Sequence, residues 1–161
     1  MDSDVILADF QKMAGFFIRR LNQISVSIFA DRMTQGGYDF TPVQFAALSM
    51  LSKQPGMDQA TLAGLIAYDR VTLGGVVDRL EAKGLVDRRV SKNDRRAKEL
   101  FLTSCGEQVL AKLVPVVTLL QEDILAGLND EEKGQLLALM EKATLAGNEQ
   151  SRVRLITRKA S

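Results

Sequence analysis

Apolar residues near the N-terminus recur at alternating spacings of three and four, at Leu7, Phe10, Ala14, Phe17, Leu21, Ile24 and Ile28. This spacing predicts one helix over residues 4–33 with a single long apolar face. A helix of this length carries more apolar surface than a small domain can cover by itself. We therefore expect part of the face to pack on a second copy of the chain, with burial inside the same chain as the alternative.

Capping residues predict three shorter helices after the break at "QGGYD". Thr41 and Gln44 of "TPVQ" have the spacing of a capping box, and the helix that they open should end at "KQPG". Asp58 and Asp69 are expected to cap the helices "QATLAGLIA" and "RVTLGGVVDRLEAKG", and Gly84 to end the second of them. Two short helices joined by a tight turn are typical of a helix-turn-helix.

Alternating apolar residues in "LVDRRV" and "AKELFLT" predict two strands on either side of the tip "SKNDRR". Ser104 and Glu107 then have the spacing of a capping box, and the helix that they open should be kinked or broken at Pro115. Asn129 and Glu132 are expected to cap the last helix. The predicted fold is therefore mainly α, with one small β-hairpin.

The hairpin concentrates positive charge in a chain whose net charge is only +1. Residues 86–98 carry six basic and two acidic side chains, a net of +4, whereas residues 122–141 carry six acids and one lysine. A basic hairpin directly after a helix-turn-helix favours contact with a polyanion such as double-stranded DNA. The alternative is a solvated hairpin whose charges serve solubility.

The rest of the composition argues against several classes of protein. With no histidine and a single cysteine, the 161 residues offer no transition-metal site, no histidine-based triad and no intramolecular disulfide. The carboxylates that can be placed lie at helix caps and solvent-facing positions, so we expect neither an enzyme nor a cofactor. The acidic N-terminus differs from a signal peptide, and no apolar run approaches about 18 residues, which favours a cytoplasmic protein without membrane contact.

The helix that Asp69 opens is the candidate for reading DNA bases, because an α-helix fits the major groove, which is about 12 Å wide. Its expected DNA-contacting residues are Asp69, Arg70, Thr72 and Leu73. Gly74 and Gly75 each cost about 1 kcal/mol relative to alanine in a helix. Close approach either to DNA or to the preceding helix would explain them.

The hairpin can reach the adjoining minor groove, where the negative potential favours arginine. Its candidate residues are Arg88, Asp94, Arg95 and Arg96. Asp94 would be a poor DNA contact by itself. We expect it to pair with Arg88 or Arg96 and so fix the geometry of the tip.

One joint pattern runs through the helix-turn-helix and the hairpin. It consists of "RLEAKGLV" at 79–86, Arg88, "DRR" at 94–96 and "LTSCG" at 102–106. In this pattern the chain resembles the MarR family of bacterial winged-helix transcription regulators. The order of the expected helices agrees with that family over essentially the whole chain.

The resemblance implies an obligate homodimer that binds a pseudo-palindromic operator. Our hypothesis is that it acts there as a repressor, with an activator as the alternative. A single domain would cover residues 1–161, with dimerisation helices at 4–33 and 104–147, a winged helix-turn-helix lobe at 41–103 and a basic tail at 148–161. By the same analogy Arg96 enters the minor groove, supported by Asp94 and Arg88. The tail is left without an assigned role, since it could cross the dimer or touch phosphates.

Many relatives bind small aromatic acids between the dimerisation and DNA-binding regions and then release DNA. The resemblance therefore implies an effector that is a small aromatic acid or its coenzyme A thioester. Residues that could combine an apolar wall with donors for a carboxylate are Phe17, Arg19, Arg20, Gln23, Tyr38, Phe45 and Met50. The alternative is that the apolar members are plain core and the arginines a solvated face.

Two other functions are kept open. Cys105 is placed at the entrance to the fifth helix, where we expect a small buried cysteine, and the alternative is that the helix dipole makes its thiol an oxidant sensor. A ligand-binding dimer that has lost operator binding is the second possibility. The retained arginines of the hairpin tip argue against it.

Overall fold

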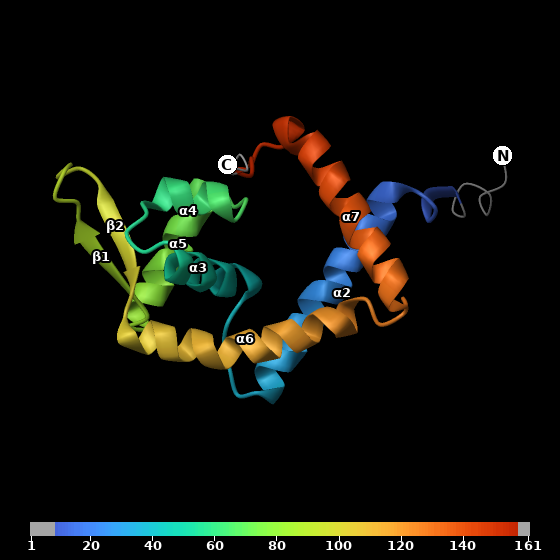
Figure 1. Cartoon of the computed structure of the whole chain (residues 1–161), viewed down its shortest axis with the longest axis horizontal. Coiled ribbons are helices and arrows are strands. Elements are labelled where there is room, and N and C mark those ends of the chain that lie inside the picture. The colour runs from blue at the N-terminus through green and yellow to red at the C-terminus, as the bar shows by residue number, and fades with distance from the viewer. Residues whose placement is uncertain (1–8, 158–161) are drawn as a thin grey trace.

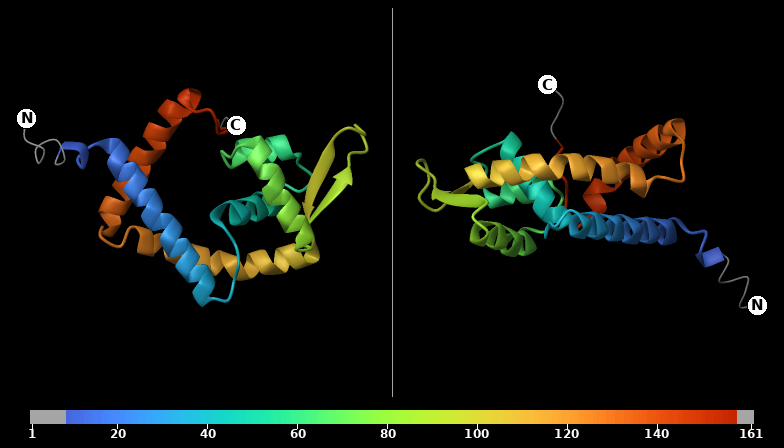
Figure 2. Two further views of the ribbon diagram at one scale, coloured as in Figure 1. Left: turned by 180° about the vertical axis from the view of Figure 1, so that it is seen from behind. Right: turned by 90° about the horizontal axis from the view of Figure 1, so that it is seen from below.

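The computed structural model describes residues 9–157. Its elements, labelled as in Figure 1, are α2 (Ala14–Gln35), α3 (Pro42–Lys53), α4 (Gln59–Leu65), α5 (Arg70–Ala82), β1 (Val86–Val90), β2 (Lys98–Leu102), α6 (Ser104–Ile124), α7 (Asp130–Gly147) and the short 3₁₀ helix η1 (Asn148–Gln150). The mainly α fold with one antiparallel hairpin is confirmed. Figures 1 and 2 show a lobe of α3, α4, α5 and the hairpin, which α6 connects to the long helices α2 and α7.

The expected single helix over residues 4–33 is wrong at its N-terminal part. Residues 11–13 form a turn, and α2 begins only after Met13, whose backbone is extended and whose side chain makes no capping bond. The turn lets the ring of Phe10 pack edge-on against that of Phe16, with 5.7 Å between the centroids. Residues 4–8, including Leu7, lie outside the described residues.

Most helix starts follow the capping predictions. The capping boxes of Thr41 with Gln44 and of Asn129 with Glu132 are both formed, and Asp58 accepts the backbone N–H of Thr61. That hydrogen bond holds the pKa of Asp58 below its ordinary value, because it stabilises the charged carboxylate.

The predicted cap at Ser104 is wrong by one residue. Thr103 is the N-cap: its hydroxyl accepts the N–H of Gly106 and donates to the carbonyl of Gly84 at 2.6 Å, so the residue joins the hairpin to both flanking helices. Of the kink or break expected at Pro115, the break is absent, since α6 runs from Ser104 to Ile124 without interruption. Pro115 lies on the exposed side of α6, where water can bind the carbonyl that lacks its helical partner.

The core lies between the helices of the lobe and α6. Its fully buried side chains include Leu48, Leu51, Leu62, Leu73, Leu80, Leu100, Leu113 and Leu120. An ion pair between Arg32 and Asp123, 2.6 Å apart, ties α2 to α6. In contrast, α7 contains no buried residue. Within residues 9–157 no single helix is long and apolar enough to cross a membrane, although the bent pair α4–α5 passes on length and composition.

Candidate nucleic-acid interface

Helices α4 and α5 form the predicted helix-turn-helix, with a bend of 108° between them. The turn places Ala67 in the left-handed region at φ 51°, and the N–H of Tyr68 bonds the carbonyl of Ala63. The side chain of Gln59 donates to the carbonyl of Arg70 at 3.2 Å, which ties the starts of the two helices together. The first turn of α5 is therefore held firmly on α4.

Asp69 is the N-cap of α5, as predicted. Its carboxylate accepts both the backbone N–H and the hydroxyl of Thr72, each at 2.8 Å. The backbone N–H of Thr72 holds the pKa of Asp69 below its ordinary value. These bonds occupy the side chains of both residues, whereas Arg70 beside them is exposed and forms no ion pair within the described residues.

The expectation that Leu73 contacts DNA is wrong. Its side chain is 0% exposed and lies in the core with Val76, Val77 and Leu80, so it cannot reach a base edge. The outward apolar residue of this turn is Val71, which is 86% exposed. Sequence reasoning missed Val71, although a helical wheel centred on the core residues of α5 places it on the opposite face.

The two glycines of α5 have different neighbours. A Cβ on Gly74 would lie 3.2 Å from Nε2 of Gln59 on α4, so this glycine serves close packing of the two helices. A Cβ on Gly75 would meet only the guanidinium of Arg79, at 3.7 Å. Gly75 lies four residues after Val71 and therefore on the same outward face.

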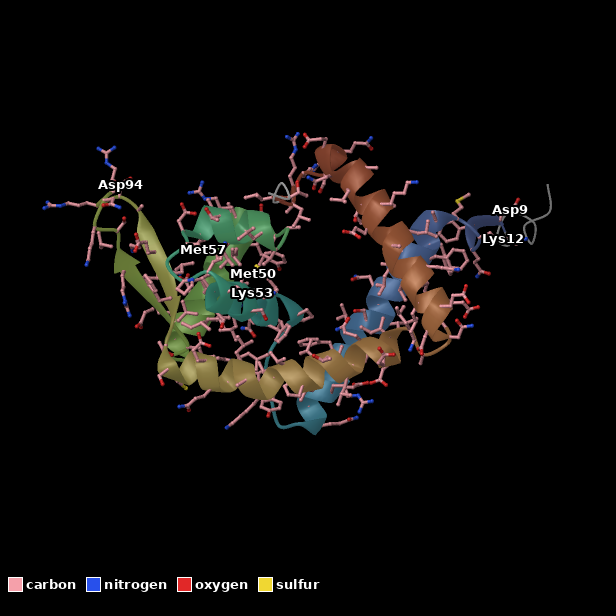
Figure 3. The ribbon with its side chains drawn as sticks, in the orientation of Figure 1. Asp9, Lys12, Met50, Lys53, Met57 and Asp94 are labelled. Carbon is pink, nitrogen blue, oxygen red and sulfur yellow. The ribbon has the colours of Figure 1, made fainter. Side chains whose placement is uncertain are left out.

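The hairpin is the wing that the sequence predicts. Strands β1 and β2 pair from Val86–Leu102 to Val90–Lys98, and Asp94 lies at the outer tip (Figure 3). The carboxylate of Asp94 accepts a hydrogen bond from the backbone N–H of Arg96 at 2.9 Å. The backbone carbonyl of Asp94 accepts one from the N–H of Ala97. Asp94 thus shapes the tip through the backbone of Arg96 rather than through a guanidinium group.

Arg88 does not pair with Asp94 and is turned away from the tip. Its guanidinium forms an ion pair with Asp78 and lies 3.6 Å from the carboxylate of Glu81, both on α5. This residue holds β1 on α5 and neutralises two acids that would otherwise repel phosphates. A direct DNA contact by Arg88, as the sequence suggested, conflicts with this geometry.

Other arginines of the hairpin divide into two kinds. Arg89 stacks on the ring of Phe101, 4.5 Å from its centroid, and lies 3.6 Å from the carboxylate of Asp87. Arg95 and Arg96 at the tip are exposed, and neither forms an ion pair within residues 9–157. Free positive charge is therefore concentrated where the hairpin projects furthest from the lobe.

The seven expected effector residues are not brought together. Arg19 lies over the ring of Phe16, Arg20 donates to Gln23 at 2.9 Å, and Phe17 lines a hollow of about 690 Å³ between α2, α6 and α7. Tyr38, Phe45 and Met50 instead pack against the core, and Figure 3 shows Met50 on α3, away from the N-terminal end of the chain.

A larger hollow of about 960 Å³ lies within one chain, between α2 and the lobe, and is here called the interlobe crevice. Its lining comes from α2, the segment leading into α3, Tyr68 and one face of α5, namely Asn22, Val26, Asp39, Thr41, Pro42, Val43, Gln44, Tyr68, Thr72, Val76, Arg79, Ala82 and Lys83. None of the seven expected effector residues, all of which are described, lines it.

Two cations four residues apart line the crevice, Arg79 in the last turn of α5 and Lys83 at its C-cap. Lys83 donates to the carbonyl of Asp39 at 2.7 Å and lies over the ring of Phe40. Arg79 forms no ion pair within the described part of the chain. An unpaired guanidinium beside the apolar side chains of Val26 and Val76 fits a small carboxylate. The spacing of Arg79 and Lys83 in "RLEAK" was the available sequence signal.

The structure also places Cys105 differently from the expectation. The expectation of a small buried cysteine is wrong, because the thiol is exposed in the first turn of α6.

Comparisons with known proteins agree on one family. A sequence model of the MarR family matches residues 40–98. The protein assigned as transcriptional regulator of the hcr operon in Thauera aromatica is 34% identical over 128 residues, which cover 80% of this chain and 76% of that protein. The structure of Bordetella bronchiseptica BpsR, whose DNA binding is regulated by 6-hydroxynicotinic acid, matches with a TM-score of 0.79 and 27% identity over 84% of this chain and 95% of that one. The transcriptional repressor CouR, bound to a 23-mer DNA duplex, matches with a TM-score of 0.73 and 29% identity over 86% and 95%.

Proposed function

Because this chain belongs to the MarR family of transcriptional regulators, we propose that it is a homodimeric repressor which a small aromatic acid, or its coenzyme A thioester, releases from a pseudo-palindromic operator. The observation that carries the DNA-binding mode is the pairing pattern of the basic side chains. Acids on α5 are neutralised by Arg88, whereas Arg70, Arg95 and Arg96 are left without ion pairs among the described residues.

In the proposed complex the first turn of α5 enters the major groove. Arg70 and the exposed Val71 meet base edges, where a valine methyl group suits the methyl group of thymine. Arg96 enters the adjoining minor groove from the tip, and Asp94 holds the backbone from which it projects. Two lobes of one dimer would read half-sites about one helical turn apart.

Removing the guanidinium of Arg96 tests the wing. We expect Arg96→Ala to weaken operator binding about tenfold or more and to lower the salt dependence by roughly one phosphate contact for each of the two lobes. The matched control is Lys142→Ala on α7, which removes one positive charge far from the wing and should change neither quantity. Binding by Arg96→Ala equal to that of the unmodified protein at every salt concentration would show that Arg96 contacts no DNA.

Gly75→Ala separates stability from DNA binding. Alanine at this open helical position should raise the free energy of unfolding by up to about 1 kcal/mol, while the added methyl group obstructs the approach of α5 to the groove and lowers operator affinity. The comparison is Gly74→Ala, where Gln59 must move by a few tenths of an ångström. Chemical denaturation and operator titration measure the two effects, and an unchanged operator affinity would remove Gly75 from the interface.

The dimer is supported by apolar side chains that the single chain leaves uncovered. They lie on α2, α6 and α7 and are Phe17, Ile18, Leu119, Leu137 and Leu139. A surface of this kind is costly to expose to water, and a second copy of the same helices would cover it. Operator binding by two lobes also requires that they be linked.

The effector is proposed to occupy the interlobe crevice, with its carboxylate on Arg79. Thr72 and Arg79 belong to the DNA-reading helix, whereas Asn22 and Val26 belong to α2, so a bound ligand contacts both sides of the lobe boundary. A ligand that prefers one separation of α5 from α2 shifts the protein toward that state. If that state separates the two lobes incorrectly for the operator, binding of the effector releases DNA.

Thermal melting tests the effector class. An aromatic acid at 100 times its dissociation constant should add about 2.7 kcal/mol of stability, whereas the neutral amide of the same acid should add much less. Arg79→Met should abolish the difference between acid and amide, and Lys142→Met should preserve it. Equal responses of the Arg79→Met variant and the unmodified protein would place the carboxylate elsewhere.

A second candidate is oxidant sensing, which the exposure of Cys105 favours. With one cysteine in the chain, oxidation would give a sulfenic acid or a mixed or intermolecular disulfide. Peroxide treatment should then release operator from the unmodified protein but not from Cys105→Ser. A ligand-binding dimer without operator binding is less well supported, because Arg95 and Arg96 are exposed at the tip.

A further inference from the structure

The segment after α7 folds back on itself, and most of its side chains are exposed. The side-chain amide of Asn148 forms two hydrogen bonds with the backbone of Leu155. It donates to the carbonyl at 3.0 Å and accepts from the N–H at 2.8 Å. Ser151 bonds the backbone of Val153 in both directions, and Arg154 forms an ion pair with Glu149 at 3.1 Å. These contacts close residues 148–156 into a compact loop, here called the strap.

The strap ends on the helix-turn-helix. The N–H of Ile156 donates to the carbonyl of Gly64 in the last turn of α4, at 2.8 Å. Carbonyls in the last turn of a helix lack helical partners, so the strap satisfies one of them. Figures 1 and 2 show the chain passing from the end of α7 to α4.

Gly64 is shaped to receive this contact. A Cβ at this position would lie 2.2 Å from Cδ1 and 2.5 Å from Cγ1 of Ile156, so any other residue would force the isoleucine side chain to move. Glycine inside a helix costs about 1 kcal/mol relative to alanine. The loss of helix stability at Gly64 is explained by the close contact with Ile156 that only glycine permits.

From these contacts we propose that the strap is an intramolecular tie, which holds α4 at a set angle to α7 and so positions the DNA-reading helix. Since α4 packs on α5, its orientation determines that of α5. In the homodimer of the proposed function, on which this inference rests, each strap would limit the range of separations between the two lobes. A narrower range favours operator binding because less orientational freedom is lost on association.

A designed disulfide tests the contact without DNA. The ideal Cβ of Gly64 lies 3.6 Å from the Cβ of Ile156, within the range of about 3.5–4.5 Å found in disulfides. Gly64→Cys combined with Ile156→Cys, in a Cys105→Ser background, should form a bond within one chain on mild oxidation. A bond between chains, which gives a covalent dimer on a non-reducing gel, would overturn the intramolecular tie. Failure to form any bond would also overturn it.

Operator affinity tests the positioning role. Ile156→Ser and Asn148→Ala release the strap without changing charge, and each should lower affinity about threefold to tenfold with an unchanged salt dependence. Gln150→Ala, an exposed change in the same segment, is the control and should have no effect. Unchanged affinity in both release variants would overturn the positioning role, and so would a loss accompanied by lower salt dependence. If no operator binding is found even for the unmodified protein, the proposed function fails, while the cross-linking result still decides whether the strap is a tie.

Discussion

Ile18→Lys is expected to split the dimer and to lower operator affinity roughly 100-fold or more, because each separated lobe would bind a single half-site without the benefit of its linked partner. The side chain of Ile18 is 70% exposed in the single chain. A lysine there should therefore leave the fold of one chain intact. In the dimer the same ammonium group would be buried against apolar helices, which is strongly unfavourable.

Ser27→Lys is the matched control for this change. Ser27 is exposed on the same helix, and nine residues at about 100° each place it on the side of α2 opposite to Ile18. Both variants add one positive charge, so a difference between them reports the location of the interface. Sedimentation measures the state of association, and circular dichroism confirms the fold. An Ile18→Lys variant that is still dimeric with full operator affinity would exclude this part of α2 from the dimer contact.

Gly106→Ala is expected to lower the free energy of unfolding by about 3 kcal/mol, an effect comparable to severe overpacking of a core. A Cβ on Gly106 would lie 2.2 Å from the carbonyl oxygen of Leu85 and 3.2 Å from its carbon. These are backbone atoms, and the same carbonyl accepts the N–H of Thr103 at 3.0 Å. The methyl group therefore displaces the junction where the hairpin meets α6.

Denaturant titration checks this prediction, and Gly75→Ala serves as its control. Both changes add one methyl group to a helix, but the methyl group at residue 75 meets only a flexible guanidinium and should stabilise the protein. If Gly106→Ala were as stable as the unmodified protein, the close approach of α6 to the hairpin would be looser than the structure shows.

Features that depend on residues close together in the chain could be predicted from the sequence. Asp58, Asp69 and the pair of Asn129 with Glu132 cap helices through hydrogen bonds that span three residues, so their spacing alone indicates the structure. The hairpin followed from alternation along two short strands. Spacing alone failed at Ser104, because Thr103 and Ser104 are both good N-cap residues. The hydrogen bond from Thr103 to the carbonyl of Gly84 decides between them.

The candidate site depended on contacts that spacing does not determine. A shift of one position along a helix rotates a side chain by about 100°, so assigning Leu73 rather than Val71 to the outward face exchanged a core residue for an exposed one. Likewise, Arg88 pairs with Asp78 on another element and not with a carboxylate of the hairpin. Arg79 lines a crevice only because folding brings α2 across from α5.

Local hydrogen bonding and hydrophobic periodicity by themselves determined the class of fold, most helix starts and the hairpin. The charged side chains of residues 86–98 gave the hairpin its basic character, and the motif through residues 79–106 carried the resemblance to the family. Tertiary structure alone decided which arginines have partners, which face of α5 is free, the exposure of Cys105 and the contact of Ile156 with Gly64. The physical reason is the range of the interactions. Capping and periodicity act within a few residues, whereas ion pairing, burial and the seat on Gly64 depend on segments that only folding brings together, up to the 92 positions that separate Gly64 from Ile156.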